Sequence, residues 1–536
     1  MVPRRGCAER GRQILSPLAL SSAGSVVRSG DRPESYLVLE RLSGYKAVLS
    51  GGSSCVPRNG TATTTASQRA AGAIARPEQS LTPESQSSLS VEERDLALGL
   101  YLDSVQRHPP ESWVTGGGSH REHAPAYFQY PAMMSPVVQR DLLAAVLSVA
   151  PESRSIFDPF CGSGTILSEA MYAGLSCWAS DINPLAVLLC RVKSGMYRAD
   201  VLSSHRRDVL RRARSDSSAN IETGLANWKK WFRRAAAREL STLRRAIRSI
   251  TDADSRRFFW ACLAETVRVT SNSRTSTYKL HIREKKEIRK APLPLKAFKA
   301  ISKQNINHHK TVGQYLHQLG YLQRERYTSR LDVQRQDVTS GFKKTFSILM
   351  TSPPYGDNTT TVPYGQHSYL PLQWIDLTDI DDRAPQTLLR TTQQIDRLSL
   401  GGKLPRRREI EALKYLTDVS PTLLRVAKRL TPAPPDRRSR VLGFVRDLDT
   451  ALSKVVPAVQ VNGYMVWTIG NRRVGGYELP LADILRELLA ARSTVFVGRC
   501  KRKIPQKRMA IRNSISPTMR TEHLLVFRRI AVKAVE

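Results

Sequence analysis

The stretch Ser155-Ile-Phe-Asp-Pro-Phe-Cys-Gly-Ser-Gly-Thr165 decides how the chain is organised. Ile156 and Phe157 end a short apolar run that predicts a buried strand. Gly162 and Gly164 follow in a turn that lacks a β-carbon at two positions, so a ligand can lie directly on the backbone. The stretch therefore predicts a strand that leads into a binding turn.

A helix and a second strand follow this turn. Residues 165–173 predict a helix that ends at Gly174, so the N–H groups of the turn face a helix N-terminus with its partial positive charge. Residues 177–181 predict a second short strand that ends on the carboxylate of Asp181. This order of elements is typical of a nucleoside-binding βαβ unit, in which the acid holds ribose hydroxyls.

Asp158 indicates what kind of nucleoside fits. It stands at the C-terminal end of the first strand, where open α/β sheets bind ligands, and a carboxylate there suits a cation better than a pyrophosphate. The third glycine of a dinucleotide fingerprint is absent. We therefore expect a nucleoside that carries positive charge, with a turn that serves packing alone as the alternative.

A second informative stretch lies far downstream, where an apolar run leads into Ser352-Pro-Pro-Tyr355. Because the two prolines have no N–H, the loop offers the Ser352 hydroxyl and the Ser352 and Pro353 carbonyls as acceptors. These acceptors can receive both hydrogens of a planar exocyclic amine while Tyr355 stacks on the base that carries it. Taken alone, the same residues are also typical of a rigid turn.

Together, residues 158–165 and 351–355 resemble the cofactor and catalytic motifs of S-adenosylmethionine-dependent, amino-directed DNA methyltransferases, which modify N4 of cytosine or N6 of adenine. The resemblance implies an α/β fold, namely a doubly wound, mostly parallel, seven-stranded class I methyltransferase (Rossmann-like) sheet with a helical insertion. Serine in the first catalytic position leans toward N4 of cytosine.

The resemblance also implies the site residues. The catalytic residues expected are Ser352, Pro353, Pro354 and Tyr355. The residues expected to bind S-adenosylmethionine are Tyr130, Pro131, Ser135, Asp158, Phe160, Gly162, Gly164, Thr165, Asp181 and Asp337. Within this set, the segment with Tyr130, Pro131 and Ser135 closes over the methionine end of the cofactor, and Asp337 accepts a hydrogen bond from its adenine amine. No metal is expected.

Composition indicates the partner and the compartment. The 536 residues include 83 Lys and Arg against 47 Asp and Glu, a net charge of +36, which favours a polyanionic partner such as double-stranded DNA. Seven cysteines without a CxxC pair predict neither a disulfide framework nor a zinc site and favour a reducing cytoplasm. No apolar run approaches the roughly 20 residues of a membrane span, so no membrane association is expected.

The chain is expected to have four parts. Residues 1–95 are rich in Ser, Gly, Thr, Arg and Pro and predict a disordered, low-complexity segment. Residues 96–198 and 329–530 are expected to form the cofactor-binding and catalytic halves of the methyltransferase domain. Residues 199–328 predict a basic helical insertion, the candidate region for DNA engagement.

Two further segments are candidates to face DNA, with a merely solvated charged surface as the alternative for the first. In the insertion, apolar residues at helical spacing alternate with basic ones that include Arg244, Arg245 and Arg248, and a polar loop at 270–274 offers groups that can bond base edges. Residues 357–400 are expected to be mostly loop. Tyr364, Tyr369 and Trp374 in this segment are expected to form a base-binding rim.

Four functions remain open from the sequence. An N4-cytosine DNA methyltransferase is the first, and an N6-adenine enzyme on the same scaffold is the second. An RNA guanine-N2 methyltransferase is the third, because such enzymes share a Pro-Pro-Tyr loop. A catalytically silent nucleic-acid binder is the alternative from another class. A companion restriction endonuclease is a possible partner of the first two.

Overall fold

The computed structural model describes residues 89–115, 127–357, 361–405, 413–431, 435–474, 476–504 and 521–531. All of them belong to one compact unit that spans Arg58–Glu536. Residues 1–88 of the segment predicted to be disordered therefore lie outside the described residues. Val91 begins a helix, α2 (Val91–Arg107), so the last residues of that predicted segment are folded.

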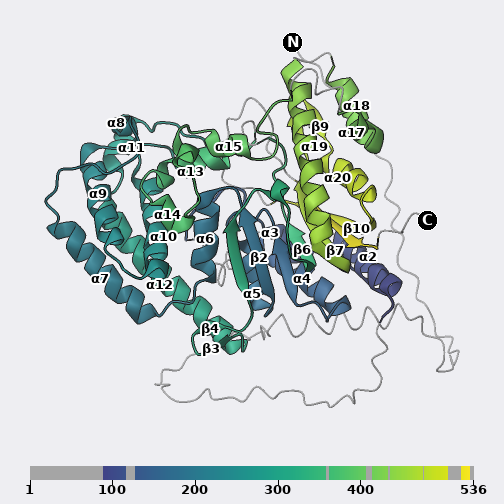
Figure 1. Ribbon diagram of the computed structural model, residues 1–536, viewed down its shortest axis with the longest axis horizontal. Coiled ribbons are helices and arrows are strands. Elements are labelled where there is room, and N and C mark those ends of the chain that lie inside the picture. The colour runs from purple at the N-terminus through teal and green to yellow at the C-terminus, as the bar shows by residue number, and fades with distance from the viewer. Residues whose placement is uncertain are drawn as a thin grey trace, which may run out of the picture. The chain divides into compact units, whose positions relative to one another are not determined.

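A seven-stranded sheet forms the centre of this unit (Figure 1). Its strands, in spatial order, are β10 (Thr494–Lys503), β11 (Thr521–Arg529), β7 (Val459–Gly470), β6 (Phe346–Thr351), β1 (Ser155–Asp158), β2 (Ser176–Asp181) and β5 (Leu331–Arg335). Strands β7, β6, β1, β2 and β5 pair in parallel, and β11 is antiparallel to both of its neighbours. The expected fold class is confirmed.

Strand β1 lies at the point where the strand order reverses. It pairs with β2 on one side and with β6 on the other, and the chain reaches β6 only after the insertion and β5. Ligands of open α/β sheets bind in the crevice outside the carboxyl ends of the strands at such a point. The fold therefore brings the two motifs of the sequence to the same sheet edge.

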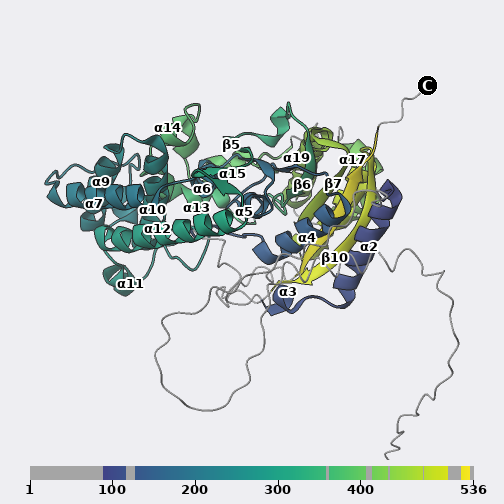
Figure 2. The same cartoon turned by 90° about the horizontal axis from the view of Figure 1, so that it is seen from below.

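Helices flank the sheet. The long helix α2 lies against β10 (Figure 2) and begins with a capping box, in which the Ser90 hydroxyl accepts from the Glu93 N–H and the Glu93 carboxylate accepts from the Ser90 N–H. The sequence predicted this cap because Ser90 and Glu93 stand three residues apart. The other helices beside the sheet are α3 (Glu111–Thr115), α4 (Pro136–Val149), α5 (Thr165–Tyr172), α6 (Pro184–Ser194), α19 (Pro435–Val455) and α20 (Leu481–Ala490).

The insertion is helical, as predicted. Its elements are α7 (Ala199–Ser215), α8 (Trp228–Trp231), α9 (Arg234–Arg248), α10 (Ala253–Thr270), α11 (Lys285–Lys290), α12 (Pro294–Gln318), β3 (Leu322–Gln323) and β4 (Arg326–Tyr327). Helix α10 packs against α6 of the sheet region and against α13 (Tyr364–Leu372). The insertion therefore shares a core with the sheet region, and deleting it would expose apolar surface.

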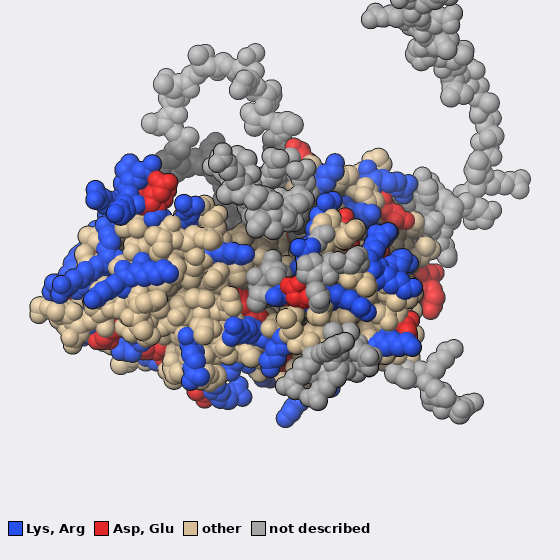
Figure 3. Space-filling model, turned by 90° about the horizontal axis from the view of Figure 1, so that it is seen from above, with Lys and Arg blue, Asp and Glu red and all other residues tan. Residues whose placement is uncertain are grey.

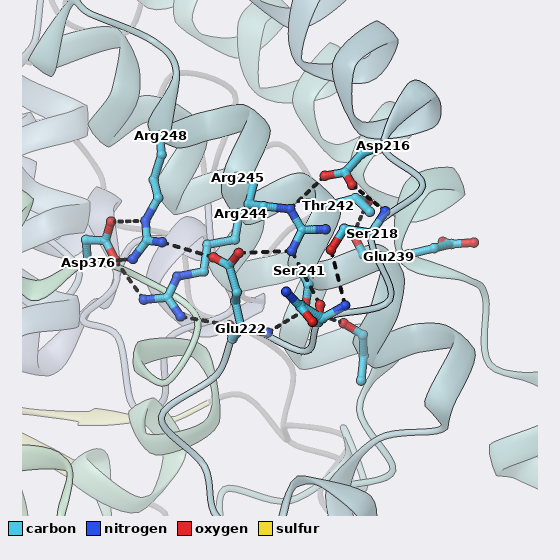
Figure 4. Close-up of polar contacts among 12 residues, drawn as sticks. Asp216, Ser218, Glu222, Glu239, Ser241, Thr242, Arg244, Arg245, Arg248 and Asp376 are labelled. Carbon is cyan, nitrogen blue, oxygen red and sulfur yellow. Dashed lines mark hydrogen bonds and ion pairs between the residues drawn. The ribbon is translucent and has the colours of Figure 1, made fainter.

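Three arginines of α9 bond carboxylates of the protein itself. Arg245 pairs with Asp216 (2.7 Å) and Glu222 (3.0 Å), and Arg248 pairs with Glu222 (3.0 Å) and Asp376 (2.6 Å). Arg244 also bonds Asp376, at 2.7 Å. Figure 4 shows this continuous network. Because each guanidinium already bonds a carboxylate, the expectation that these three arginines track phosphates is wrong.

The expected base-binding rim is also largely wrong. Residues 361–400 are mostly helical, in α13, α14 (Leu377–Ile380), η3 (Gln386–Leu389) and α15 (Gln394–Leu398). Trp374 is completely buried and packs edge-on against Phe232 of the insertion, and Tyr369 is buried as well. Aromatic rings supply large apolar surface to a core, which explains both positions. Of the three aromatic residues, Tyr364 alone reaches the site described below.

Short elements complete the described chain. They are η2 (Val338–Ser340), α17 (Lys414–Val419), α18 (Pro421–Arg429), η4 (Val456–Ala458), β8 (Arg472–Val474) and β9 (Tyr477–Leu479). Over the described residues, no helix has both the length and the apolar character that a bilayer crossing requires.

Candidate active site

A cavity of about 940 Å³, part of it open to solvent, lies at the carboxyl ends of the central strands. Its lining combines the two sequence motifs with the segment before α4, the turn after β5 and residues of α13 and α15. The predicted site residues that line it are Tyr130, Pro131, Phe160, Gly162, Thr165, Asp181, Asp337, Ser352, Pro353, Pro354 and Tyr355. Ser135, Asp158 and Gly164 do not line it.

A hydrogen bond joins the two motifs. The Thr351 hydroxyl, which immediately precedes the Ser-Pro-Pro-Tyr loop, donates to Asp158 Oδ1 at 2.6 Å across 193 residues of sequence. The Phe160 N–H donates to the same oxygen at 3.1 Å. Both motifs are therefore held in one position relative to each other by a single carboxylate.

Asp158 is completely buried, so it is placed to hold the loops instead of touching a ligand. Its second oxygen, Oδ2, has no hydrogen-bond partner among the described residues. Burial raises the pKa of Asp158 to about 7, against the hydrogen bonds from Thr351 and Phe160, which lower it. The expectation that Asp158 itself faces the ligand is not met in this structure.

The two glycines of the turn have different functions. Gly162 lines the cavity with φ at 48°, and its N–H donates to Asp181 Oδ2 at 3.0 Å. Gly164 caps α5 with φ at 76°, and a β-carbon there would come within 2.9 Å of the Cys190 sulfur. Gly164 is therefore required by the turn and its packing. Thr165 begins α5 and lines the cavity.

Asp181 ends β2 with both oxygens accepting backbone hydrogens. Oδ2 accepts from Gly162, and Oδ1 accepts from the Asn183 N–H at 2.9 Å. Burial raises the pKa of Asp181 to about 6, while these N–H groups lower it. Each carboxylate oxygen keeps a lone pair, so the group can still accept ligand hydroxyls.

Asn183 is a site residue that the sequence analysis missed. Its Nδ2 donates to the Tyr130 hydroxyl (3.1 Å) and to Ser368 Oγ (2.8 Å), and its Oδ1 caps α6 by accepting from the Leu185 N–H (3.1 Å). The pair Asn183-Pro184 at the start of a helix is a capping signal that could have identified it. The amide thus connects the Asp181 turn to two other walls of the cavity.

Tyr130 forms part of one wall with Pro131. Its ring stacks on that of Tyr364, with centroids 5.8 Å apart and planes at 25°. Ser135 caps the N-terminus of α4 without a side-chain hydrogen bond and stands outside the cavity. The segment 130–135 therefore contributes its aromatic and proline residues to the site and uses its serine to begin a helix.

The turn after β5 carries Asp337, which lies two residues beyond the end of the strand. Its Oδ1 accepts from the Thr339 N–H (2.9 Å) and hydroxyl (2.8 Å), which caps η2. Gln336 and Val338 line the cavity beside it. The turn thus offers polar groups and an apolar side chain to a flat ligand.

The Ser352-Tyr355 loop closes the far wall. Ser352 Oγ and the Tyr355 hydroxyl lie 3.1 Å apart and share a hydrogen bond. Behind the loop, the buried Asp357 binds Arg472 (3.1 Å), and a β-carbon at Gly356 would overlap the Arg472 guanidinium. The glycine after the tyrosine therefore lets an ion pair support the loop from behind.

Helix α15 supplies the last wall through Ile395, Leu398 and the residues that follow it. Asp396 on this helix accepts from the N–H groups of Gly365 (2.8 Å) and Gln366 (3.0 Å) at the start of α13. Burial raises the pKa of Asp396 to about 6, against these two hydrogen bonds. Nothing in the local sequence marked this carboxylate, since its partners are backbone groups 30 residues away.

Comparisons with known proteins address the family. A family model described as "RMKL-like, methyltransferase domain" matches residues 127–241, which include the glycine turn and Asp181. The Type II methyltransferase M.MvaI of Kocuria varians is 31% identical over 443 residues, which cover 78% of this chain and 92% of that protein. No solved structure matches the chain. The expectation of a methyltransferase is confirmed, and the chain belongs to the Type II methyltransferase family.

Proposed function

We propose that this protein transfers a methyl group from S-adenosylmethionine to the exocyclic amine of a base flipped out of double-stranded DNA, with N4 of cytosine as the first candidate. The hydrogen bond between Asp158 and Thr351 is the main support, because it joins a nucleoside-binding turn to an amine-binding loop around one cavity. The similarity to a Type II methyltransferase favours DNA as the substrate.

The residues of the cavity fit this cofactor. The Gly162 turn brings backbone within reach of a ligand, and the Asp181 carboxylate can accept ribose hydroxyls. Asp337, Tyr130 and Pro131 line the same cavity. Asp337 would accept from the adenine amine, and Tyr130 and Pro131 would form a wall for the methionine end. Asp158 would act indirectly, by holding the turn against the catalytic loop.

The catalytic loop suits an amine. An aromatic amine is a poor nucleophile because its lone pair is delocalised into the ring. The Ser352 hydroxyl and the Pro353 carbonyl would each accept one hydrogen of the amine, which draws the nitrogen toward tetrahedral geometry and stabilises developing positive charge. Ser352 can donate its own hydrogen to Tyr355 and still accept from the amine, since a hydroxyl has two lone pairs. The bound cofactor supplies the activated methyl group.

Tyr355 would hold the flipped base. Extracting a base from a duplex costs a few kcal/mol, and stacking on an aromatic ring offsets part of this cost. Tyr355 lines the cavity beside Ser352 and is half-buried, so one side of the ring is supported by the protein. N6 of adenine is the second candidate amine, because the same acceptors fit it.

The basic surface of the insertion, residues 199–328, would contact phosphates. On the face seen in Figure 3, Lys and Arg side chains outnumber Asp and Glu over much of the described surface. Near the start of α9, the insertion has three exposed basic residues, Lys229, Lys230 and Arg234. These residues replace Arg244, Arg245 and Arg248 as candidates for the counterion release that drives DNA binding.

The test is to incubate the protein with cofactor labelled in the transferred methyl group, together with duplex DNA or RNA, and to identify the methylated nucleoside by mass. We expect N4-methylcytidine in its deoxy form from DNA, and no label with a Ser352→Ala, Tyr355→Ala double variant. N6-methyldeoxyadenosine would move the proposal to adenine. Label in RNA guanine alone would refute the DNA proposal and leave an RNA guanine-N2 methyltransferase. A companion restriction endonuclease, if present, would cut the same unmethylated sites.

A further inference from the structure

A small hairpin projects from the insertion between α10 and α11. Ser273 and Ile282 form an antiparallel bridge, and the Arg274 N–H donates to the His281 carbonyl at 2.7 Å. Arg283 fixes its base, since its side chain donates to the carbonyls of Ser273 (2.6 Å) and Val269 (3.1 Å). The segment 273–282 is therefore a loop closed at an anchored base by one antiparallel bridge, and we name it the 273–282 hairpin.

The base and the tip of this hairpin differ in exposure. Ser271, Asn272 and Ser273 are buried, and Asn272 Nδ2 donates to the Lys230 carbonyl at 3.1 Å. Most polar groups of the loop expected at 270–274 are thus buried within the protein instead of being exposed to DNA. The exposed side chains are those of Arg274, Thr275, Ser276, Lys279, His281 and Ile282.

The hairpin lies next to the candidate active site. The Tyr278 ring packs edge-on against His367 of α13, with centroids 5.9 Å apart. His367 follows the cavity-lining Tyr364 by three residues, which is just under one helical turn. His367 also bonds the Gln129 carbonyl (3.1 Å), and Gln129 precedes Tyr130 of the cavity wall. The hairpin thus contacts α13 directly, and His367 links it to the segment that leads into Tyr130.

The chemistry of the hairpin suits base edges better than phosphates alone. Residues 271–283 contain no carboxylate, so nothing in the segment repels DNA. The exposed tip combines a guanidinium, an ammonium, an imidazole and two hydroxyls, which can donate to and accept from bases. Helix α11, by contrast, presents Lys285, Lys286, Arg289 and Lys290, which offer donors only.

We propose that the 273–282 hairpin enters the DNA major groove beside the flipped base and reads the neighbouring base pairs. The major groove, about 12 Å wide, is broad enough to admit an α-helix or a narrow loop, and each base pair presents a distinct pattern of donors and acceptors there. Arg274 is the leading specificity residue, because a guanidinium can bond O6 and N7 of guanine together. This inference rests on the proposed function and assigns sequence reading to a defined element of the insertion.

The test measures sequence discrimination. The full-length protein methylates a library of duplexes, the modified positions are sequenced, and methylation rates are then compared on the recognised site and on its single-base variants. We expect Arg274→Ala to lower the ratio between the best site and a variant altered at one flanking position by roughly 5- to 150-fold. Arg289→Ala, which removes the same charge from exposed α11, is the matched control and should keep the ratio.

Three outcomes decide the inference. An unchanged ratio in Arg274→Ala, with an active wild type, refutes the hairpin proposal and leaves the proposed function intact. A fall in rate that is equal for every sequence, with a smaller salt dependence, means phosphate contact and also refutes it. A wild type that methylates no DNA refutes both. Melting temperature and cofactor affinity serve as folding controls, and Thr275→Ala is the second variant if Arg274→Ala lowers either one.

Discussion

Three carboxylates of the cavity region and two on the side of the insertion have opposite surroundings. In the cavity region, Asp158, Asp181 and Asp396 accept from backbone N–H groups and a hydroxyl, and burial raises the pKa of each. On the side of the insertion, Asp216 and Asp376 accept from arginines, and each has a lowered pKa. For Asp376 the hydrogen bonds from Arg248 and Arg244 outweigh the effect of burial.

This difference distinguishes carboxylates that can interact with a ligand from carboxylates that support the structure. A carboxylate held by neutral donors keeps its charge uncompensated, so it can respond to a ligand or to a proton. The charge of a carboxylate that already bonds two arginines is compensated, and such a carboxylate joins its own segment to the helix that carries its partners. The number of basic residues therefore overstates how many of them can bind phosphate, since three arginines are used in the network around Glu222.

The largest effect on stability is expected at Asp376, because a substitution there removes a carboxylate from the arginine network of the insertion. Asp376→Ala leaves Arg244, whose side chain is 14% exposed, without its carboxylate, while the more exposed Arg248 keeps Glu222. We expect a loss of about 3 kcal/mol in the free energy of unfolding, measured by denaturant titration.

Asp382→Ala is the matched control for this change. The Asp382 side chain is 89% exposed and lies 3.9 Å from the exposed Arg383. An exposed pair of this kind is worth about 0–1 kcal/mol, so stability should hardly change. Equal effects of the two substitutions would contradict the structural function of the network.

A second expectation concerns Tyr355, which lines the cavity. A substitution there should lower the rate of methyl transfer more than it lowers stability. Tyr355→Ala removes the ring expected to stack on the flipped base, so kcat/KM for methyl transfer to DNA should fall about 5- to 150-fold. Tyr355→Phe keeps the ring, loses the hydrogen bond to Ser352 and should retain most of the activity. Full turnover by the alanine variant would show that the ring does not hold the base.

The last expectation concerns Asp158→Asn and the pH dependence of stability, where the effect is smallest when it is counted per pH unit. The folded pKa of Asp158, about 7, lies above the ordinary value near 4, so the folded state binds more protons than the unfolded state between these limits. Its contribution to the free energy of unfolding therefore falls as pH rises from about 4 to 7, by on the order of 1.4 kcal/mol per pH unit.

Asparagine cannot titrate and should remove this contribution. The free energy of unfolding of the variant, relative to the wild type, should thus increase with pH over that window, as measured by denaturant titration at several pH values. Asp181 and Asp396 titrate in both proteins, so their contributions cancel in the difference. A difference that stays constant with pH would mean that Asp158 is already ionised throughout.

Local patterns predicted much of this protein. The β1 turn, the helix that ends at Gly174, the acid at the end of β2 and the Ser90 cap all depend on residues within a few positions of one another. Such features follow from backbone sterics and local hydrogen bonds, which a linear sequence displays. The seven-stranded fold was predicted from the two motifs together, through their resemblance to a family.

Partners that lie far apart in the sequence explain what was missed. Trp374 looked like a rim residue because its partner Phe232 is remote, and Arg248 looked like a phosphate ligand because Asp376 is 128 residues away. In the same way, Asp158 was expected to face a ligand until the fold gave it Thr351.

The sequence by itself determined the strands, turns and chemical groups of the site, because these depend on each residue and its near neighbours. The tertiary structure alone decided which carboxylates meet arginines and which meet backbone N–H groups. The physical reason is that the free energy of a charge depends on what surrounds it in space, and burial makes that dependence strong.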